Sequence, residues 1–216
     1  MKFIRNPVRF GQPRADEPPL PFSTPAAGQA GGVVHERGVL LPEAALVVAA
    51  LPAAGEAVHA VMTGSYDLMD LLVAVINEVG PLDVLRISTL SFSAKNLESM
   101  LWLFDDGKVK RLDLLTSTFF RGTQKGLWET TQAEFASRKQ RAAVARIHTK
   151  VITLACGGLP ENAARRYVIE GSANLRTNDS WEQFVFLQSP AVHDFHAAWI
   201  EQLVKNHEGE AAEQGR

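Results

Sequence analysis

Two stretches of the sequence decide how this chain folds and where its chemistry lies: ARIHTKVI at residues 145–152 and YVIEGSAN at residues 167–174. Each has the apolar, β-branched composition of a strand and carries polar side chains in its second half. Side chains two positions apart point to the same face of a strand, so we expect His148 and Lys150 to project together. An imidazole beside a fixed cation, next to a small-residue turn with hydroxyl and amide groups, indicates a phosphate site.

The sequence around these stretches alternates strands with helices. Short apolar runs predict strands at 59–63, 83–90, 111–117, 142–147, 151–155, 166–170 and 181–187. Apolar residues at helical spacing predict helices at 66–78, 93–104, 127–139 and 191–204. This alternation predicts an α/β fold with a mixed, mostly parallel sheet flanked by helices on both faces.

Residues 1–55 differ from the rest of the chain in composition. Proline and glycine interrupt any periodicity there, which predicts an N-terminal arm that either clamps a partner or forms a poorly ordered lead-in. Within the arm, residues 38–42 have the pattern of a short strand or an edge contact. We therefore expect one catalytic or binding domain over 56–206, followed by a polar tail over 207–216.

The overall composition is that of a soluble protein. Of the 216 residues, 46% are hydrophobic and 21% are charged, with a formal net charge of −2. Binding to nucleic acid would therefore depend on a local basic patch and not on the total charge. The single cysteine, the absence of a signal-peptide pattern at the start and the short apolar runs predict a cytoplasmic location without a membrane span.

The two opening stretches, together with a glutamate on the following strand, resemble the phospholipase D superfamily, in particular its endonuclease-like branch with a single His-x-Lys motif. The resemblance extends over about residues 57–205. The residues that carry it are His148, Lys150, Gly171, Ser172, Asn174 and Glu182.

This chain departs from the family pattern in two places. The family usually has an aspartate five positions after the lysine, and this chain has Ala155 there. The spacing from Lys150 to Gly171 is also longer than usual, by about the length of the loop at 157–165, which a hairpin can accommodate.

The resemblance implies a metal-independent phosphodiesterase, without a cofactor, in which His148, Lys150, Asn174 and Glu182 are catalytic. His148 would form a covalent phosphohistidine, Glu182 would orient its imidazole, and a second histidine would protonate the leaving oxygen. Lys150, Ser172 and Asn174 would bind the phosphate.

Because this chain has one motif, its resemblance to the single-motif branch also implies a homodimer with a composite active site, and a nuclease acting on DNA or RNA. A non-catalytic module that binds nucleic acid or phosphate is the alternative that Ala155 supports. A phospholipid-acting enzyme is a further alternative, although the single motif speaks against it. We expect Arg165, Arg166 and Arg176 to make the site locally basic. We also expect His193 and His196 to lie on the surface, and Trp181 to be a core or interface residue.

Overall fold

The structure is a computed structural model that describes residues 35–41, 44, 51–62, 66–157, 165–176 and 180–207. Most of the expected arm therefore lies outside the described residues. The strands are β1 (His35–Leu41), β2 (Glu56–Met62), β3 (Leu82–Thr89), β4 (Val109–Ser117), β5 (Arg141–Ala145), β6 (Val151–Cys156), β7 (Arg166–Gly171) and β8 (Glu182–Gln188). The helices are α1 (Leu68–Val79), α2 (Ala94–Asp105), α3 (Thr118–Thr123), α4 (Lys125–Ser137) and α5 (Pro190–His207).

All eight strands form one sheet in the order β1-β2-β8-β7-β6-β3-β4-β5. The fold is mixed α/β, but the expectation that parallel pairing predominates is wrong. Four of the seven neighbouring pairs are antiparallel, because β6, β7 and β8 follow one another as antiparallel strands, β6 pairs antiparallel with β3 and β8 pairs antiparallel with β2. Of the segment expected to be a short strand within the arm, residues 38–41 are part of β1, which pairs in parallel with β2, and residue 42 lies outside the described residues.

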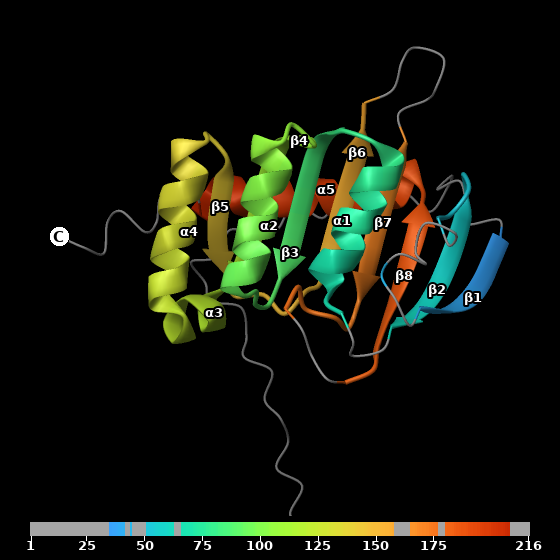
Figure 1. Cartoon of the computed structure of the whole chain (residues 1–216), viewed down its shortest axis with the longest axis horizontal. Helices are drawn as coiled ribbons and strands as arrows, with labels where there is room; N and C mark the ends of the chain where they lie inside the picture. The colour runs from blue at the N-terminus through green and yellow to red at the C-terminus, as the bar shows by residue number, and fades with distance from the viewer. Residues whose placement is uncertain are drawn as a thin grey trace, which may run out of the picture.

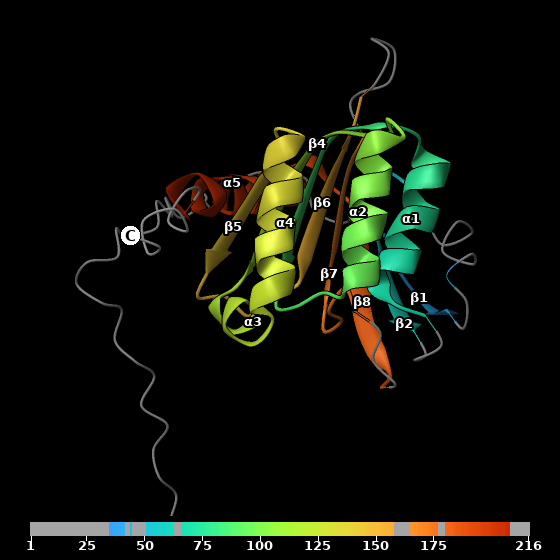
Figure 2. The ribbon, with the colours of Figure 1, turned by 60° about the vertical axis from the view of Figure 1, so that its left-hand side comes forward.

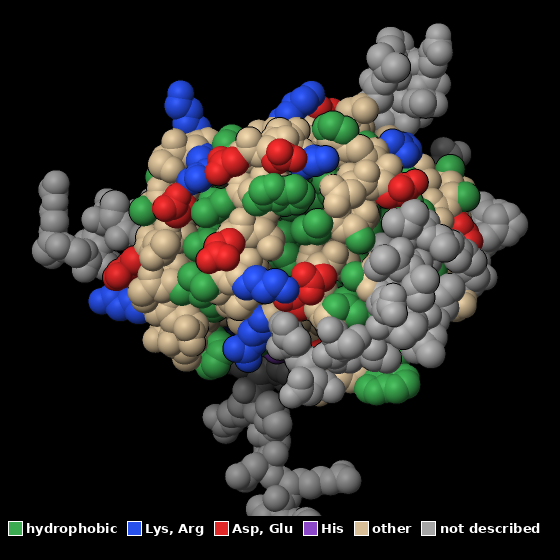
Figure 3. Space-filling model, viewed as in Figure 1, with side chains coloured by type: hydrophobic (Ala, Val, Ile, Leu, Met, Phe, Trp, Pro, Cys, Tyr) green, Lys and Arg blue, Asp and Glu red, His purple; other side chains and the backbone are tan. Residues whose placement is uncertain are grey.

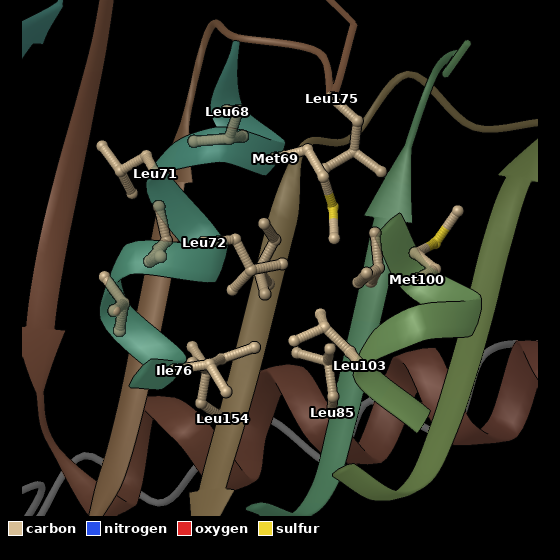
Figure 4. Packing of buried hydrophobic residues seen from close by; sticks show 14 of the residues in the cluster. Leu68, Met69, Leu71, Leu72, Ile76, Leu85, Met100, Leu103, Leu154 and Leu175 are labelled. Atoms are coloured by element: carbon tan, nitrogen blue, oxygen red, sulfur yellow. The ribbon is translucent and has the colours of Figure 1, made fainter. Parts of the chain in front are cut away.

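One face of the sheet is covered by α1, α2 and α4 (Figure 1). Two of these helices start at capping boxes, in which Asp67 and Ser93 accept hydrogen bonds from the backbone of the first helical turn. Their apolar stripes pack on the central strands, as the close-up in Figure 4 shows for α1 and α2 against β3 and β6. The labelled side chains in this cluster are Leu68, Met69, Leu71, Leu72, Ile76, Leu85, Met100, Leu103, Leu154 and Leu175.

The last helix, α5, crosses the opposite face of the sheet (Figures 1 and 2). Its inner side contributes to a second apolar cluster with side chains of β4, β5, β6 and β7. Successive residues of β4 point to opposite faces of the sheet, so Leu114 belongs to the first cluster and Leu115 to the second. The sheet is therefore the middle layer between two hydrophobic cores. Among the described residues, no helix is long and apolar enough to cross a membrane.

A buried group of charges fastens α5 to the sheet. Asp113 on β4 is fully buried and binds Arg141 of β5 in a bidentate pair, with distances of 2.8 and 2.7 Å. Arg111 and Arg86 approach the same carboxylate to 3.1 and 3.3 Å. Arg86 also donates to Glu201 of α5 at 2.7 Å. Asp113 thus joins three strands, and Arg86 and Glu201 extend the cluster to the helix, so that removal of the Asp113 carboxylate would leave several cations uncompensated.

We predict that Asp113→Asn lowers the free energy of unfolding by about 3–5 kcal/mol, because a buried charge pair that loses one partner leaves the other unpaired. The matched control is Asp83→Asn on β3, whose carboxylate pairs with Lys110 at 2.7 Å on the surface. That pair is exposed, so its loss should cost no more than about 1 kcal/mol. Urea unfolding followed by circular dichroism measures both, and equal losses would contradict the assigned role of Asp113.

A second prediction concerns acid stability. Burial alone would raise the pKa of Glu201, but the hydrogen bond from Lys205 and the charge of Arg86 outweigh it and lower the pKa to about 2. A carboxylate with a depressed pKa stabilises the fold above its unfolded pKa, and the contribution disappears as the pH falls towards the folded value. Wild-type protein should therefore lose at most about 3 kcal/mol through this group between about pH 5 and pH 2. Glu201→Gln should be less stable at pH 7 and should lose less on acidification.

Candidate functional site

The His-x-Lys segment lies in a connection that crosses one edge of the sheet. β5 is an outer strand and β6 lies three positions further in, so residues 146–150 pass over the ends of β4 and β3. His148 and Lys150 are therefore not part of a strand, and the strand-alternation argument for their shared direction is wrong. Strand ends, turns and helix starts meet at this edge, as in other sheets whose ligand crevices lie at the carboxyl ends of strands.

The two side chains nevertheless lie together. Lys150 Nζ is 3.4 Å from His148 Nδ1 and donates to the backbone oxygen of His148 at 3.2 Å. His148 is exposed, and Lys150 is half-buried. When the lysine is charged and the imidazole neutral, Nδ1 faces an ammonium donor, so the ring proton resides on Nε2.

The electrostatics of Lys150 favour a counter-ion. Burial lowers the pKa of its ammonium group, and the charge of Glu182 partly offsets this effect. A partly desolvated ammonium gains more from an incoming anion than a fully hydrated one does. Lys150 is therefore suited to hold a phosphate oxygen.

Thr149, between the two, anchors the crossing segment to the sheet. Its hydroxyl lies 2.6 Å from the hydroxyl of Ser88 near the end of β3. Ser88 is buried, so this hydrogen bond fixes the height of the segment above the strand ends. The sequence pattern gave no indication of this anchor, because the two residues are 61 positions apart.

The Gly-Ser turn after β7 forms the neighbouring part of the edge. Gly171 N donates to Lys150 O at 3.2 Å, which places the turn directly beside the lysine. The hydroxyl of Ser172 donates to the Glu182 carboxylate and accepts from Gln183 N at 3.1 Å. Gly171 is needed here because a Cβ atom would lie 2.2 Å from Gln183 O and 2.7 Å from the Phe184 Cα atom.

These residues line an open groove with a volume of about 390 Å³. Its lining comprises His148, Thr149, Lys150, Val151, Glu170, Gly171, Ser172, Gln183 and Val185. Three of the expected site residues, His148, Lys150 and Ser172, are thus brought together.

Asn174 and Glu182 line a separate, smaller hollow with Arg176 on the side of α1. The buried Oδ1 atom of Asn174 has no hydrogen-bond partner in the described structure. Glu182 approaches the groove through its hydrogen bond with Ser172 and its charge effect on Lys150. The contact expected between Glu182 and the His148 imidazole stays a prediction.

Two of the arginines expected to surround the site lie elsewhere. Arg166 begins β7, at the end opposite to Gly171, and Arg165 donates to Val79 O at the end of α1. The prediction that these two make the site basic is wrong, because the strand carries them to the other edge of the sheet. Arg176 lies close to Asn174.

The alanine at the position of the family aspartate is also remote from the groove. Ala155 is buried in β6 opposite Val84, four residues beyond Val151. That separation is about 13 Å along a strand. The departure therefore does not alter the groove directly.

A hydrogen-bonded trio next to the groove was missed from the sequence. His196 of α5 lies with Nε2 3.1 Å from the Glu170 carboxylate, and the Trp199 indole donates to its Nδ1 at 3.0 Å. The indole can only donate, so the neutral imidazole carries its proton on Nε2. The hydrogen bond from His196 lowers the pKa of Glu170. The expectation that His193 and His196 lie on the surface is wrong, since His193 is buried and His196 is 13% exposed.

The i, i+3 spacing of His196 and Trp199 on one helix was the available signal for this trio. Within the part of the chain that the structure describes, no three or more His, Cys, Asp and Glu side chains lie close enough to hold a metal ion. The helical face over α1, α2 and α4 carries basic and acidic side chains interspersed with apolar ones (Figure 3). The edge of the sheet at which β3, β4, β5 and β7 end and β6 and β8 begin, called the strand-end edge below, therefore remains the best candidate for a functional site.

No family model and no curated protein matches this sequence. Among solved structures, a polyphosphate kinase from Porphyromonas gingivalis is 11% identical with a TM-score of 0.47 over 71% of this chain and 27% of its own. TrmBL2, an archaeal chromatin protein, is 10% identical with a TM-score of 0.45 over 69% of this chain and 53% of its own. This chain thus spans about a quarter and about half of these two chains. Both TM-scores lie below 0.5, so these likenesses decide nothing about function.

We predict that Gly171→Ala destabilises the protein by about 1–3 kcal/mol, the usual cost of forcing extra volume into packed structure. The added methyl group would meet the β8 backbone, which cannot rotate away as a flexible side chain would. Gly122→Ala in α3 is the control, because a Cβ atom there meets nothing within 4 Å. It should keep or raise stability by up to about 1 kcal/mol. Thermal unfolding of both variants measures the difference, and a neutral Gly171→Ala would contradict the close approach.

Proposed function

We propose that this protein is a metal-independent phosphodiesterase whose preferred substrate is nucleic acid, DNA or RNA. The observation that carries the proposal is the ammonium group of Lys150, 3.4 Å from His148 Nδ1 in an open groove that Ser172 also lines. A nucleophile or acid–base group beside a cation suits attack on a phosphate diester. The resemblance to the phospholipase D superfamily supports the same reaction on the same residues.

The nucleophile in this proposal is His148. Phosphate binding would draw Lys150 from Nδ1 onto a nonbridging oxygen, which leaves the ring free to carry its proton on Nδ1. Nε2 then attacks phosphorus, the bond to the leaving oxygen breaks, and a phosphohistidine forms. Water then attacks the phosphorus and gives a proton to the second imidazole described below, the P–N bond breaks, and both histidines are regenerated.

The leaving oxygen needs a proton from a second imidazole. In this proposal it comes from His148 of a second copy in a homodimer, with the site on the two-fold axis. The exposure of His148 supports this arrangement, since the ring is open to a partner.

Ser172 and Asn174 donate to the phosphate in the proposed complex, and Glu182 holds the imidazole by its Nδ1 proton. In the free protein Ser172 donates to Glu182. Substrate binding would therefore have to break the hydrogen bond between Ser172 and Glu182, so that Ser172 can donate to the phosphate and Glu182 can accept from the imidazole.

A second candidate function is phosphate or nucleic-acid binding without turnover. It is favoured by the position of Asn174 and Glu182, which line a hollow separate from the groove that contains His148. A protein with this function would bind an oligonucleotide and leave it intact.

We predict that His148→Ala and Lys150→Met each reduce hydrolysis of bis(p-nitrophenyl) phosphate by at least about a hundredfold, the usual effect of removing an acid–base or nucleophilic group. EDTA should leave wild-type activity unchanged. His59→Ala, an exposed histidine on β2, is the matched control and should hydrolyse the diester at the wild-type rate. Activity that EDTA removes, or that survives in His148→Ala, would contradict the proposal. Absence of hydrolysis with intact oligonucleotide binding would favour the second candidate.

A further inference from the structure

Two large aromatic side chains at the strand-end edge are exposed to solvent. Phe119 is 62% exposed and Trp181 is 69% exposed, the highest values for large hydrophobic side chains among the described residues. A core role for Trp181 is therefore wrong. Burial of a large aromatic side chain would stabilise the fold, and neither ring is buried. Both rings are therefore available for contact with a partner outside the described chain.

The two aromatics lie on either side of the candidate site. Phe119, at the start of α3, lines a largely apolar hollow together with Arg146 and His148. Trp181 immediately precedes Glu182, whose carboxylate binds Ser172 in the groove. Phe119 follows the end of β4, Trp181 precedes the start of β8, and β3, β6 and β7 lie between β4 and β8. Four strand spacings correspond to about 19 Å.

Cationic side chains lie near both rings: Arg146 lines the hollow of Phe119, Lys150 lines the groove, and Arg176 lines the smaller hollow with Glu182. Arg146 and Arg176 are exposed and Lys150 is half-buried at the same edge. Two carboxylates are also present, and each accepts a hydrogen bond within the protein, Glu170 from His196 and Glu182 from Ser172. The edge thus combines positive charge with two exposed aromatic faces, and it is not a continuous apolar patch.

We propose that this edge binds single-stranded nucleic acid, with bases stacked on Phe119 and Trp181 and phosphates held near Arg146 and Lys150. This inference rests on the proposed function and narrows its substrate class. Base–aromatic stacking combined with a cationic groove is the usual means of holding a single strand. In a duplex, neighbouring base pairs cover the faces of the bases, so the two rings select unpaired strands.

The test is fluorescence anisotropy with a labelled oligothymidylate of about 16 nucleotides, at the upper end of single-strand site sizes. The His148→Ala background prevents cleavage during the measurement. In that background, Phe119→Ala and Trp181→Ala should each weaken binding about five- to a hundredfold, the range for loss of one stacked base. Trp181→Phe should retain most of the affinity, because it keeps an aromatic face.

The matched control is Trp102→Ala, which removes a 44% exposed tryptophan from α2, on the helical face. Its affinity for the oligonucleotide should be that of the background protein. An equal loss in Trp102→Ala, or equal affinity for a duplex of the same length, would overturn the proposal.

Two other results would assign the aromatics differently. Phe119- and Trp181-dependent capture by phosphatidylglycerol vesicles, without oligonucleotide binding, would make the edge a membrane contact. A change from dimer to monomer in sedimentation of the same variants, at unchanged oligonucleotide affinity, would make it a subunit interface. Hydrolysis of bis(p-nitrophenyl) phosphate by the wild-type protein tests the proposed function separately. Binding without hydrolysis would keep the stacking proposal, and hydrolysis without binding would remove it.

Discussion

The connection from β5 to β6 is the constraint on which the candidate site depends. It must carry the chain from an outer strand across β4 and β3 to the interior of the sheet. Three strand spacings are about 14 Å, and the six backbone steps from Ala145 to Val151 reach about 20 Å at full extension. The connection therefore uses about 14 Å of its reach of about 20 Å, begins with a tight turn in which Ile147 N donates to Ala145 O at 2.9 Å, and lies over the strand ends. His148, at its middle, borders the hollows on both sides.

This crossing is possible because the strands around it are held on both faces. On one side α1 and α2 pack against β3 and β6, and on the other the Asp113 charge cluster ties α5 to β3, β4 and β5. Asp113 at the centre of this cluster is fully buried, so removing its charge would leave the arginines around it without their partner. The edge can then carry exposed polar and aromatic residues without relying on them for stability.

The groove combines one cation with carboxylates that are already engaged. Glu170 is fixed by His196 and Trp199, and Glu182 by Ser172. Carboxylates held in place by hydrogen bonds can orient neighbouring hydroxyl or imidazole groups. Both proposed functions begin with a phosphate bound to Lys150. Catalysis would further require Glu182 and Asn174 to move into the groove, whereas binding without turnover would not.

The sequence by itself determined the elements of the domain. Apolar periodicity located each of the helices α1, α2, α4 and α5 and the strands from β2 to β8 within a few residues, because burial on one face imposes that spacing. It also picked out His148, Lys150 and Ser172, since unusual polar residues at strand ends are visible locally. Strand direction and order were decided only by the tertiary structure, because pairing depends on contacts between residues far apart in the chain. For that reason the predominance of antiparallel pairs could not be predicted, Arg165 and Arg166 lie at the opposite edge, and Thr149, Glu170, His196 and Trp181 lie around the candidate site.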